Sequence, residues 1–97
     1  MEVLSPSNQG DELKKELQQL LSMVSDSPQE IEIVTHVMGS RIYFEIHAGE
    51  QTKLIIGSKG KNINAIRGIM EISCNKRRRH YNSPYIQIDI NVISIKN

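Results

Sequence analysis

A glycine-containing loop is the part of this sequence whose residue types and spacing could do chemistry. Gly57 and Gly60 enclose Ser58 and Lys59 within the run IIGSKGKNINAI over residues 55–66. Glycine permits positive φ and a close approach of the backbone to another molecule. The loop amides and the N-terminus of the following helix then point toward one place, which favours an anion. Lys59 adds a mobile positive charge, so the loop predicts a clamp for a phosphate backbone.

Apolar and basic residues beside the loop complete the predicted site. The flanking isoleucines would pack the two neighbouring helices and form an apolar floor that suits unstacked bases. Lys53 and Lys61 lie nearby in the sequence and add positive charge. Together these residues predict a phosphate-backbone clamp beside an apolar floor.

The net charge of +1 hides an uneven distribution of charge. Residues 53–79 hold eight basic residues and one acidic residue, so this segment carries +7 and the rest of the chain carries −6. Such clustering indicates a surface that faces a polyanion. A secondary basic patch follows at Lys76, Arg77, Arg78 and Arg79. The alternative interpretation of that run is a solvated helix end whose basic residues complement the helix dipole.

Other kinds of chemistry have little support in the sequence. His36, His47 and His80 are scattered, with no metal-ligand spacing, so we expect no metal site and no cofactor. Cys74 is the only cysteine, and its pattern favours a small buried hydrophobe over a nucleophile. No set of acid, base and nucleophile is evident. We therefore expect no catalytic residues, no small-molecule substrate and no enzymatic activity.

The elements that must position the loop can be read from hydrophobic periodicity. Residues 1–10 are polar and predict a flexible tail, and residues 11–24 carry apolar side chains at helical spacing. Two alternating runs then flank Gly39-Ser40, a pair suited to a type II′ turn. This register pairs residue 37 with 42, 35 with 44 and 33 with 46, which places the apolar side chains together.

The second half of the chain continues with two helices and a strand. Residues 52–56 predict a very short helix before the loop, and a longer helix follows the loop to about residue 80. Ile63, Ile66 and Met70 have the spacing of core residues on that helix. Alternation over residues 86–92 predicts a half-buried strand. The whole is an α+β domain over residues 11–97, in the order α-β-β-α-α-β.

The loop and its surroundings resemble the KH family of single-stranded nucleic-acid-binding domains. The run from Ile55 to Ile66 places glycines, lysine and isoleucines where that family needs them. A helix and hairpin before the loop and one strand after it look like the prokaryotic type II arrangement. The resemblance implies a three-stranded sheet packed on one face by three helices. It also implies that residues 57–60 contact the backbone of about four nucleotides, with residues 86–90 as the opposite wall of the groove. Lys53 and Lys61 would lie at the edge of the apolar floor, and Arg67 could reach either a phosphate or the protein surface. The RNA-binding residues that the resemblance implies are Lys53, Ile55, Ile56, Gly57, Ser58, Lys59, Gly60, Lys61, Ile63 and Arg67.

The chain most resembles small bacterial single-KH proteins of the KhpA type. That resemblance implies a single-stranded RNA-binding protein, an RNA chaperone activity, and pairing with itself as a homodimer or with a second KH protein. Two features depart from it: Ser58 stands where a basic residue is common, and residues 75–84 are long and basic. The KH domain of the KhpB/Jag type is therefore the runner-up resemblance.

Composition sets the expected compartment. The sequence has no apolar run near the ~20 residues of a membrane helix and no signal-peptide pattern, so we expect a cytoplasmic protein with no membrane partner.

One function of another class stays open. The domain would then be a KH-shaped protein-interaction or dimerisation module with weak or no RNA binding, and it would tolerate loss of the Lys59 charge.

Overall fold

The computed structural model describes residues 6–81 and 86–93 of the 97-residue chain. Its helices are α1 (Pro6–Val24), α2 (Thr52–Ile56) and α3 (Lys61–Tyr81), and its strands are β1 (Glu32–Met38), β2 (Arg41–His47) and β3 (Gln87–Ile93). Single 3-10 turns lie at Pro28–Glu30, Gly49–Gln51 and Ser58–Gly60. The order of helices and strands is the predicted one.

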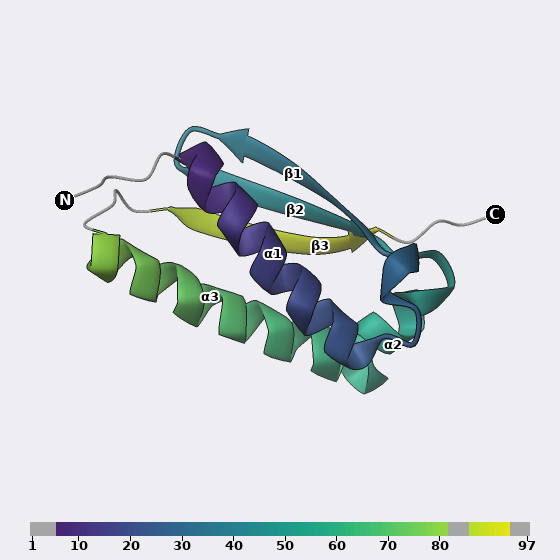
Figure 1. The fold of residues 1–97 in the computed structure, drawn as a ribbon. Coiled ribbons are helices and arrows are strands. Elements are labelled where there is room, and N and C mark those ends of the chain that lie inside the picture. The colour runs from purple at the N-terminus through teal and green to yellow at the C-terminus, as the bar shows by residue number, and fades with distance from the viewer. Residues whose placement is uncertain (1–5, 82–85, 94–97) are drawn as a thin grey trace.

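The three strands form one mixed sheet, and the helices pack on one of its faces (Figure 1). Strand β2 lies in the centre, antiparallel to β1 and parallel to β3. Parallel neighbours need a crossover connection, because the chain must return to the starting end of the sheet. Here α2, the glycine loop and α3 make that return. The α+β fold class is confirmed, with the sheet and three helices expected of a type II KH domain.

The hairpin has the register that the sequence predicts. Val37 lies opposite Ile42, Thr35 opposite Phe44, and residue 33 opposite residue 46. Gly39 has φ of 59°, whereas Ser40 does not have a positive φ, which is the signature of a type II′ turn. The turn and the apolar pairs thus select the same register.

The core lies between the helices and the inner face of the sheet. Leu13, Leu17 and Leu21 form one stripe of α1 and are at most 1% exposed. Each fully buried leucine contributes about 1.5–3 kcal/mol relative to an exposed one. On α3, the predicted core residues Ile63, Ile66 and Met70 are all buried, and Cys74 is buried beside them. The buried hydrophobic set is Leu13, Leu17, Leu21, Ile33, Ile42, Phe44, Ile46, Ala48, Ile55, Ile63, Ile66, Met70, Cys74, Ile86 and Ile90.

The first helix begins earlier than the sequence predicts. Residues 6–10, which the sequence analysis assigns to a tail, form the first turns of α1, and residues 1–5 lie outside the described residues. Gly10 is buried on the same helix face as Leu13, and a Cβ on it would lie 3.6 Å from Thr35 Cγ2. The helix thus approaches the hairpin through a residue without a side chain. A hydrophobicity pattern does not register such a contact.

We expect Thr35→Val to stabilise the domain. The Thr35 hydroxyl oxygen is buried and has no hydrogen-bond partner among the described residues. An unpaired buried hydroxyl costs about 1–3 kcal/mol, and valine keeps the shape without that group. The free energy of unfolding should rise by about 1 kcal/mol and Tm by about 4–8 °C in a melting curve. Thr52→Val is the matched control, because the Thr52 hydroxyl donates to Gly49 O at 2.7 Å. A lower Tm for Thr35→Val would contradict the prediction.

Candidate nucleic-acid interface

The loop between α2 and α3 has an unusual backbone. Gly57 has φ 75° and ψ 175°, a region that is essentially restricted to glycine. Lys59 has φ 57° and ψ 27°, and it is the one non-glycine residue with positive φ in the described part of the chain. Gly60 follows with φ 77°. Strained residues of this kind are typical of ligand clamps. Two glycines at this spacing allow the backbone to adopt the turn.

The loop also presents backbone donors. The amide of Gly57 donates to Lys53 O at 2.9 Å, and that of Gly60 donates to Gly57 O at 3.1 Å. By contrast, the amides of Ser58 and Lys59 find no acceptor within the residues that the structure describes. Helix α3 starts immediately afterwards, and its first amide, that of Lys61, donates to Ser58 O, so the positive dipole end of the helix lies beside the loop. This arrangement favours an anion, as the sequence predicts.

Asn62 is a residue of the site that sequence reasoning missed. Its Nδ2 atom donates to Leu54 O at 2.8 Å, so the first turn of α3 is fastened to α2 across the loop. A Cβ on Gly57 would lie 2.7 Å from Asn62 Cγ. Gly57 is thus required for two separate reasons, its backbone conformation and the space that Asn62 occupies. The sequence signal is weak, because an asparagine near a helix start usually indicates a cap within its own helix.

We expect Asn62→Ala to loosen the loop and weaken RNA binding. The substitution removes the hydrogen bond to Leu54 O, and one such bond contributes about 1 kcal/mol. Kd for a short single-stranded RNA should rise by about fivefold if that free energy is needed to order the loop again on binding. Gln19→Ala shortens an exposed amide side chain on α1 and is the control. Equal RNA affinities for the two variants in fluorescence anisotropy would show that Asn62 does not hold the loop for binding.

Three lysines surround the loop, as predicted. Lys53 on α2, Lys59 in the loop and Lys61 at the start of α3 are all exposed, and Ser58 is exposed between them. None of these lysines forms an ion pair with a described residue. Their charges are therefore available to a ligand.

The predicted apolar floor is mostly buried. Ile55 and Ile63 are 0% and 5% exposed and belong to the core, so they support the loop from below. Ile56 is half-buried at the edge of the core. Leu54, which the sequence analysis did not select, is 39% exposed. The apolar surface near the loop is thus narrower than predicted, because α2 and α3 turn two of the three isoleucines toward the sheet.

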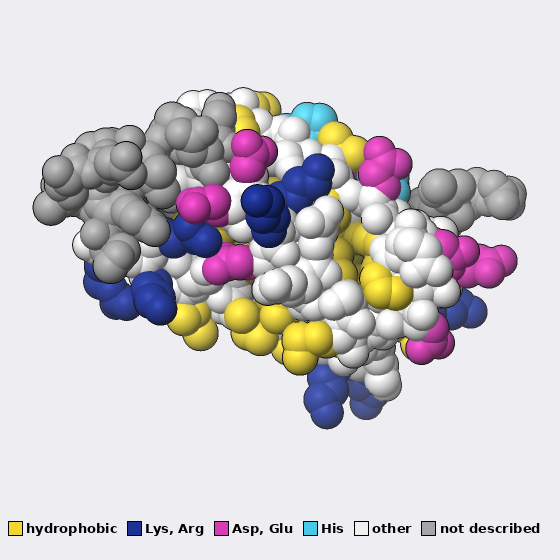
Figure 2. Space-filling model, viewed as in Figure 1, with side chains coloured by type: hydrophobic (Ala, Val, Ile, Leu, Met, Phe, Trp, Pro, Cys, Tyr) yellow, Lys and Arg dark blue, Asp and Glu magenta, His cyan; other side chains and the backbone are white. Residues whose placement is uncertain are grey.

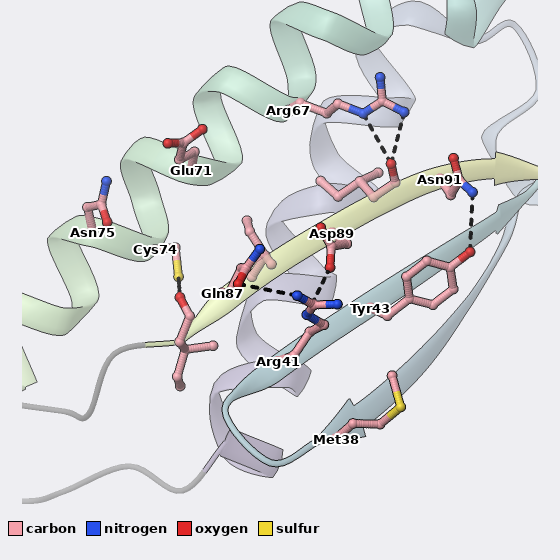
Figure 3. Close-up of a pocket in the computed structure, with 13 residues that line it drawn as sticks. Met38, Arg41, Tyr43, Arg67, Glu71, Cys74, Asn75, Gln87, Asp89 and Asn91 are labelled. Atoms are coloured by element: carbon pink, nitrogen blue, oxygen red, sulfur yellow. Dashed lines mark hydrogen bonds and ion pairs between the residues drawn. The ribbon is translucent and has the colours of Figure 1, made fainter.

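Arg67 is engaged by the protein. Its Nε and Nη2 atoms donate to Ile90 O at 3.1 and 3.0 Å, and Nη1 donates to Asn64 Oδ1 at 3.2 Å. These bonds cross a cleft of about 680 Å³ between α3 and β3 (Figure 3). The cleft places β3 opposite α3, as the resemblance implies for residues 86–90. The sequence offers two candidate contacts for Arg67, a phosphate or the protein surface. In the structure, its guanidinium contacts the protein.

The secondary basic patch divides into two parts. Lys76 and Arg79 are exposed near the end of α3, and the side chain of Arg78 lies outside the described residues. Arg77 is 17% exposed and forms ion pairs with Glu12 at 2.7 Å and with Glu16 at 3.3 Å. Arg77 therefore joins α3 to α1, and its charge is already compensated. The sequence could not separate these residues, because Glu12 and Glu16 are far from them along the chain.

The remaining side chains suggest no other chemistry at this site. Among the described residues, no group of three His, Cys, Asp or Glu side chains is placed to hold a metal ion. The Cys74 thiol is buried and donates to Ile86 O at 3.3 Å. No helix in the described ranges has the length and apolar character needed to cross a membrane.

Comparison with a protein-family model agrees with the fold. A family model described as the KH domain of KhpA/KhpB matches residues 14–84. This range contains β1, β2, α2, the whole loop and α3, together with most of α1. A search of curated proteins gave no match.

Proposed function

Because this chain belongs to the KhpA/KhpB KH-domain family, we propose that it is a non-enzymatic protein that holds single-stranded RNA through the loop at residues 57–60. KH domains as a family indicate nucleic-acid binding. The loop would clamp the backbone of about four nucleotides. The resemblance to small KH proteins of the KhpA type supports, as part of this proposal, an RNA chaperone activity in the cytoplasm.

The observation that carries the proposal is the convergence of donors and charge at the loop. The amides of Ser58 and Lys59 have no acceptor among the described residues, and the positive end of α3 lies beside them. Lys53, Lys59 and Lys61 are exposed around this point without counter-ions among the described residues. Adjacent phosphates of a single strand match this pattern, because each needs several donors and a positive field.

Fluorescence anisotropy with a labelled short single-stranded RNA tests the proposal. Binding should weaken as salt rises, with log K falling by about 0.7 per phosphate contact for each unit of log salt. A DNA strand of the same sequence shows whether the 2′-hydroxyl matters. If a folded, native chain binds neither strand at low salt, the proposal is wrong.

One observation favours a second candidate function, which is assembly with another KH domain. Ile69 and Ile72 lie three residues apart on α3 and are 49% and 70% exposed. Figure 2 shows hydrophobic side chains in a row over α3, with basic side chains near both ends of the row. Exposed apolar rows of this kind are typical of protein interfaces. A homodimer, or a pair with a second KH protein, would bury them.

Size-exclusion chromatography with light scattering tests this second function. The native chain should elute as a dimer whose mass falls to 11.0 kDa in an Ile69→Ser, Ile72→Ser variant. Met23→Ser changes an exposed hydrophobic residue on α1 and is the control. A monomeric native chain at high micromolar concentration would exclude the homodimer, and a co-expressed KH protein would then be the partner to test.

A further inference from the structure

Contacts in the cleft between α3 and β3 connect the edge of the sheet to α3. Among the described strands, β3 pairs with β2 alone, so its other edge has no described strand beside it. The carbonyl oxygen of Ile90 points to that edge and accepts both the Nε and the Nη2 bonds of Arg67. Figure 3 shows the guanidinium reaching from α3 over the strand. The planar guanidinium fork thus donates two hydrogen bonds to one acceptor, and the ammonium group of a lysine cannot reproduce this contact.

The same contacts continue from Arg67 to the loop. The third guanidinium nitrogen, Nη1, donates to Asn64 Oδ1 one turn earlier on α3. Asn64 lies against the loop, because a Cβ on Gly60 would be 3.4 Å from Asn64 Nδ2. Ile90, Arg67, Asn64 and Gly60 therefore form a continuous series from the strand edge to the loop backbone.

We propose that Arg67 is a positioning residue, which holds the first turns of α3 and the adjoining loop at a set distance from β3, and is not a ligand of RNA phosphate. This inference rests on the proposed function. All three of its guanidinium nitrogens donate to protein acceptors. Lys53, Lys59 and Lys61, in contrast, are exposed and form no ion pair with a described residue.

The distance between α3 and β3 matters because these two elements form the two sides of the cleft, which is the groove of the proposed function. Both sides would contact the same short strand of RNA. The loop would hold the phosphates, and β3 is the opposite wall. If α3 moves away from β3, a nucleotide seated on the loop no longer reaches the wall. Affinity then falls although every phosphate contact is kept. Loss of a residue that binds a phosphate has a different effect. One counter-ion fewer is then released on binding, so the salt dependence of binding also becomes weaker.

Two substitutions at one position separate these roles. Arg67→Lys keeps the charge and loses the fork, whereas Arg67→Gln loses both. We expect each to raise Kd for a short single-stranded RNA by about tenfold, as for a broken hydrogen bond from a charged group. The salt slope of Arg67→Lys should equal that of the native chain. Lys59→Gln is the matched comparison, and its slope should be smaller by about 0.7.

Opposite results would overturn the inference. Suppose that Arg67→Lys binds like the native chain, and that the slope of log K against log salt is smaller by about 0.7 for Arg67→Gln. Arg67 then binds a phosphate. If neither variant weakens binding, the contact with Ile90 does not set the groove. Melting curves for all variants establish that the proteins compared are folded.

Amide NMR spectra of the free protein keep this test separate from the test of RNA binding. Arg67→Lys should shift the amide signals of β3 residues and of the loop, including Gly60, because both ends of the contact series are released. If the shifts remain within one turn of residue 67, the positioning role is wrong even when RNA binds. If the native chain binds no RNA and the loop signals do shift, the proposed function fails and the positioning of the loop stands.

Discussion

Replacing Ser58 and Lys59 together by aspartate is expected to abolish binding of single-stranded RNA. The change reverses the charge of the loop at the point where two amides and the start of α3 face the ligand. It removes one positive charge and adds two negative ones, so phosphates would be repelled. We expect Kd to rise at least a hundredfold, about 3 kcal/mol, at low salt.

The double variant should remain folded, for a reason visible in its backbone. Lys59 already has φ 57° and ψ 27°, a conformation that aspartate tolerates better than lysine. An acidic residue beside the first turn of α3 also suits the helix dipole. Its Tm should therefore equal or exceed that of the native chain. This separates loss of binding from loss of structure.

The control for this experiment makes the same charge change elsewhere. Lys15 and Gln18 are exposed on α1, so Lys15→Asp with Gln18→Asp alters the net charge equally and leaves the loop intact. Anisotropy at two salt concentrations should show native-like affinity for this control, apart from a small general weakening. If both double variants lose binding equally, the net charge of the domain controls binding. If the loop variant still binds, the exposed Lys76 and Arg79 are the next residues to test.

Gly57→Ala is expected to produce the largest loss of stability among the loop variants. The residue would need φ near 75° with ψ near 175°, which is strained for any side chain. Its Cβ would also lie 2.7 Å from Asn62 Cγ, so the Asn62 side chain must leave Leu54 O. The two effects together should lower the free energy of unfolding by about 2–4 kcal/mol, and RNA binding should be lost with the loop geometry.

A second glycine separates the two causes. Gly49 has φ of 52° but nothing within 4 Å of a Cβ, so Gly49→Ala has the backbone strain without the collision. Urea unfolding of both variants should show a clearly larger loss for Gly57→Ala. Equal losses would mean that Asn62 moves aside freely. In the double variant Gly57→Ala, Asn62→Ala, the part of the loss caused by the collision should become smaller, because only the Cβ of residue 62, at 3.0 Å, then remains close to the added Cβ.

Most of the fold could be predicted from local patterns. The hairpin register followed from alternation and from the Gly39-Ser40 turn, because a one-residue slip would turn every apolar side chain to the wrong face. The short helix over 52–56 and the core residues of α3 followed from periodicity. The start of α1 did not, since Gly10 packs against the hairpin without an apolar side chain to signal it.

The sequence by itself determined the chemistry of the candidate site. Residues 57–60 carry two glycines, a serine and a lysine beside a helix start, and no long-range contact is needed to see that they favour a phosphate. The sequence also shows membership of the KhpA/KhpB KH-domain family, because the family model matches residues 14–84.

Only the tertiary structure decided which of the predicted residues are free to bind. Lys59 remains exposed, whereas Arg67 is bonded to Ile90 O, and Arg77 is paired with Glu12 and Glu16. These residues share a positive charge and lie in the same basic segment, residues 53–79, so composition does not distinguish them. Their partners are 23 to 65 residues away along the chain. The availability of a charge depends on which acceptors folding brings beside it, and that is a property of the packed elements.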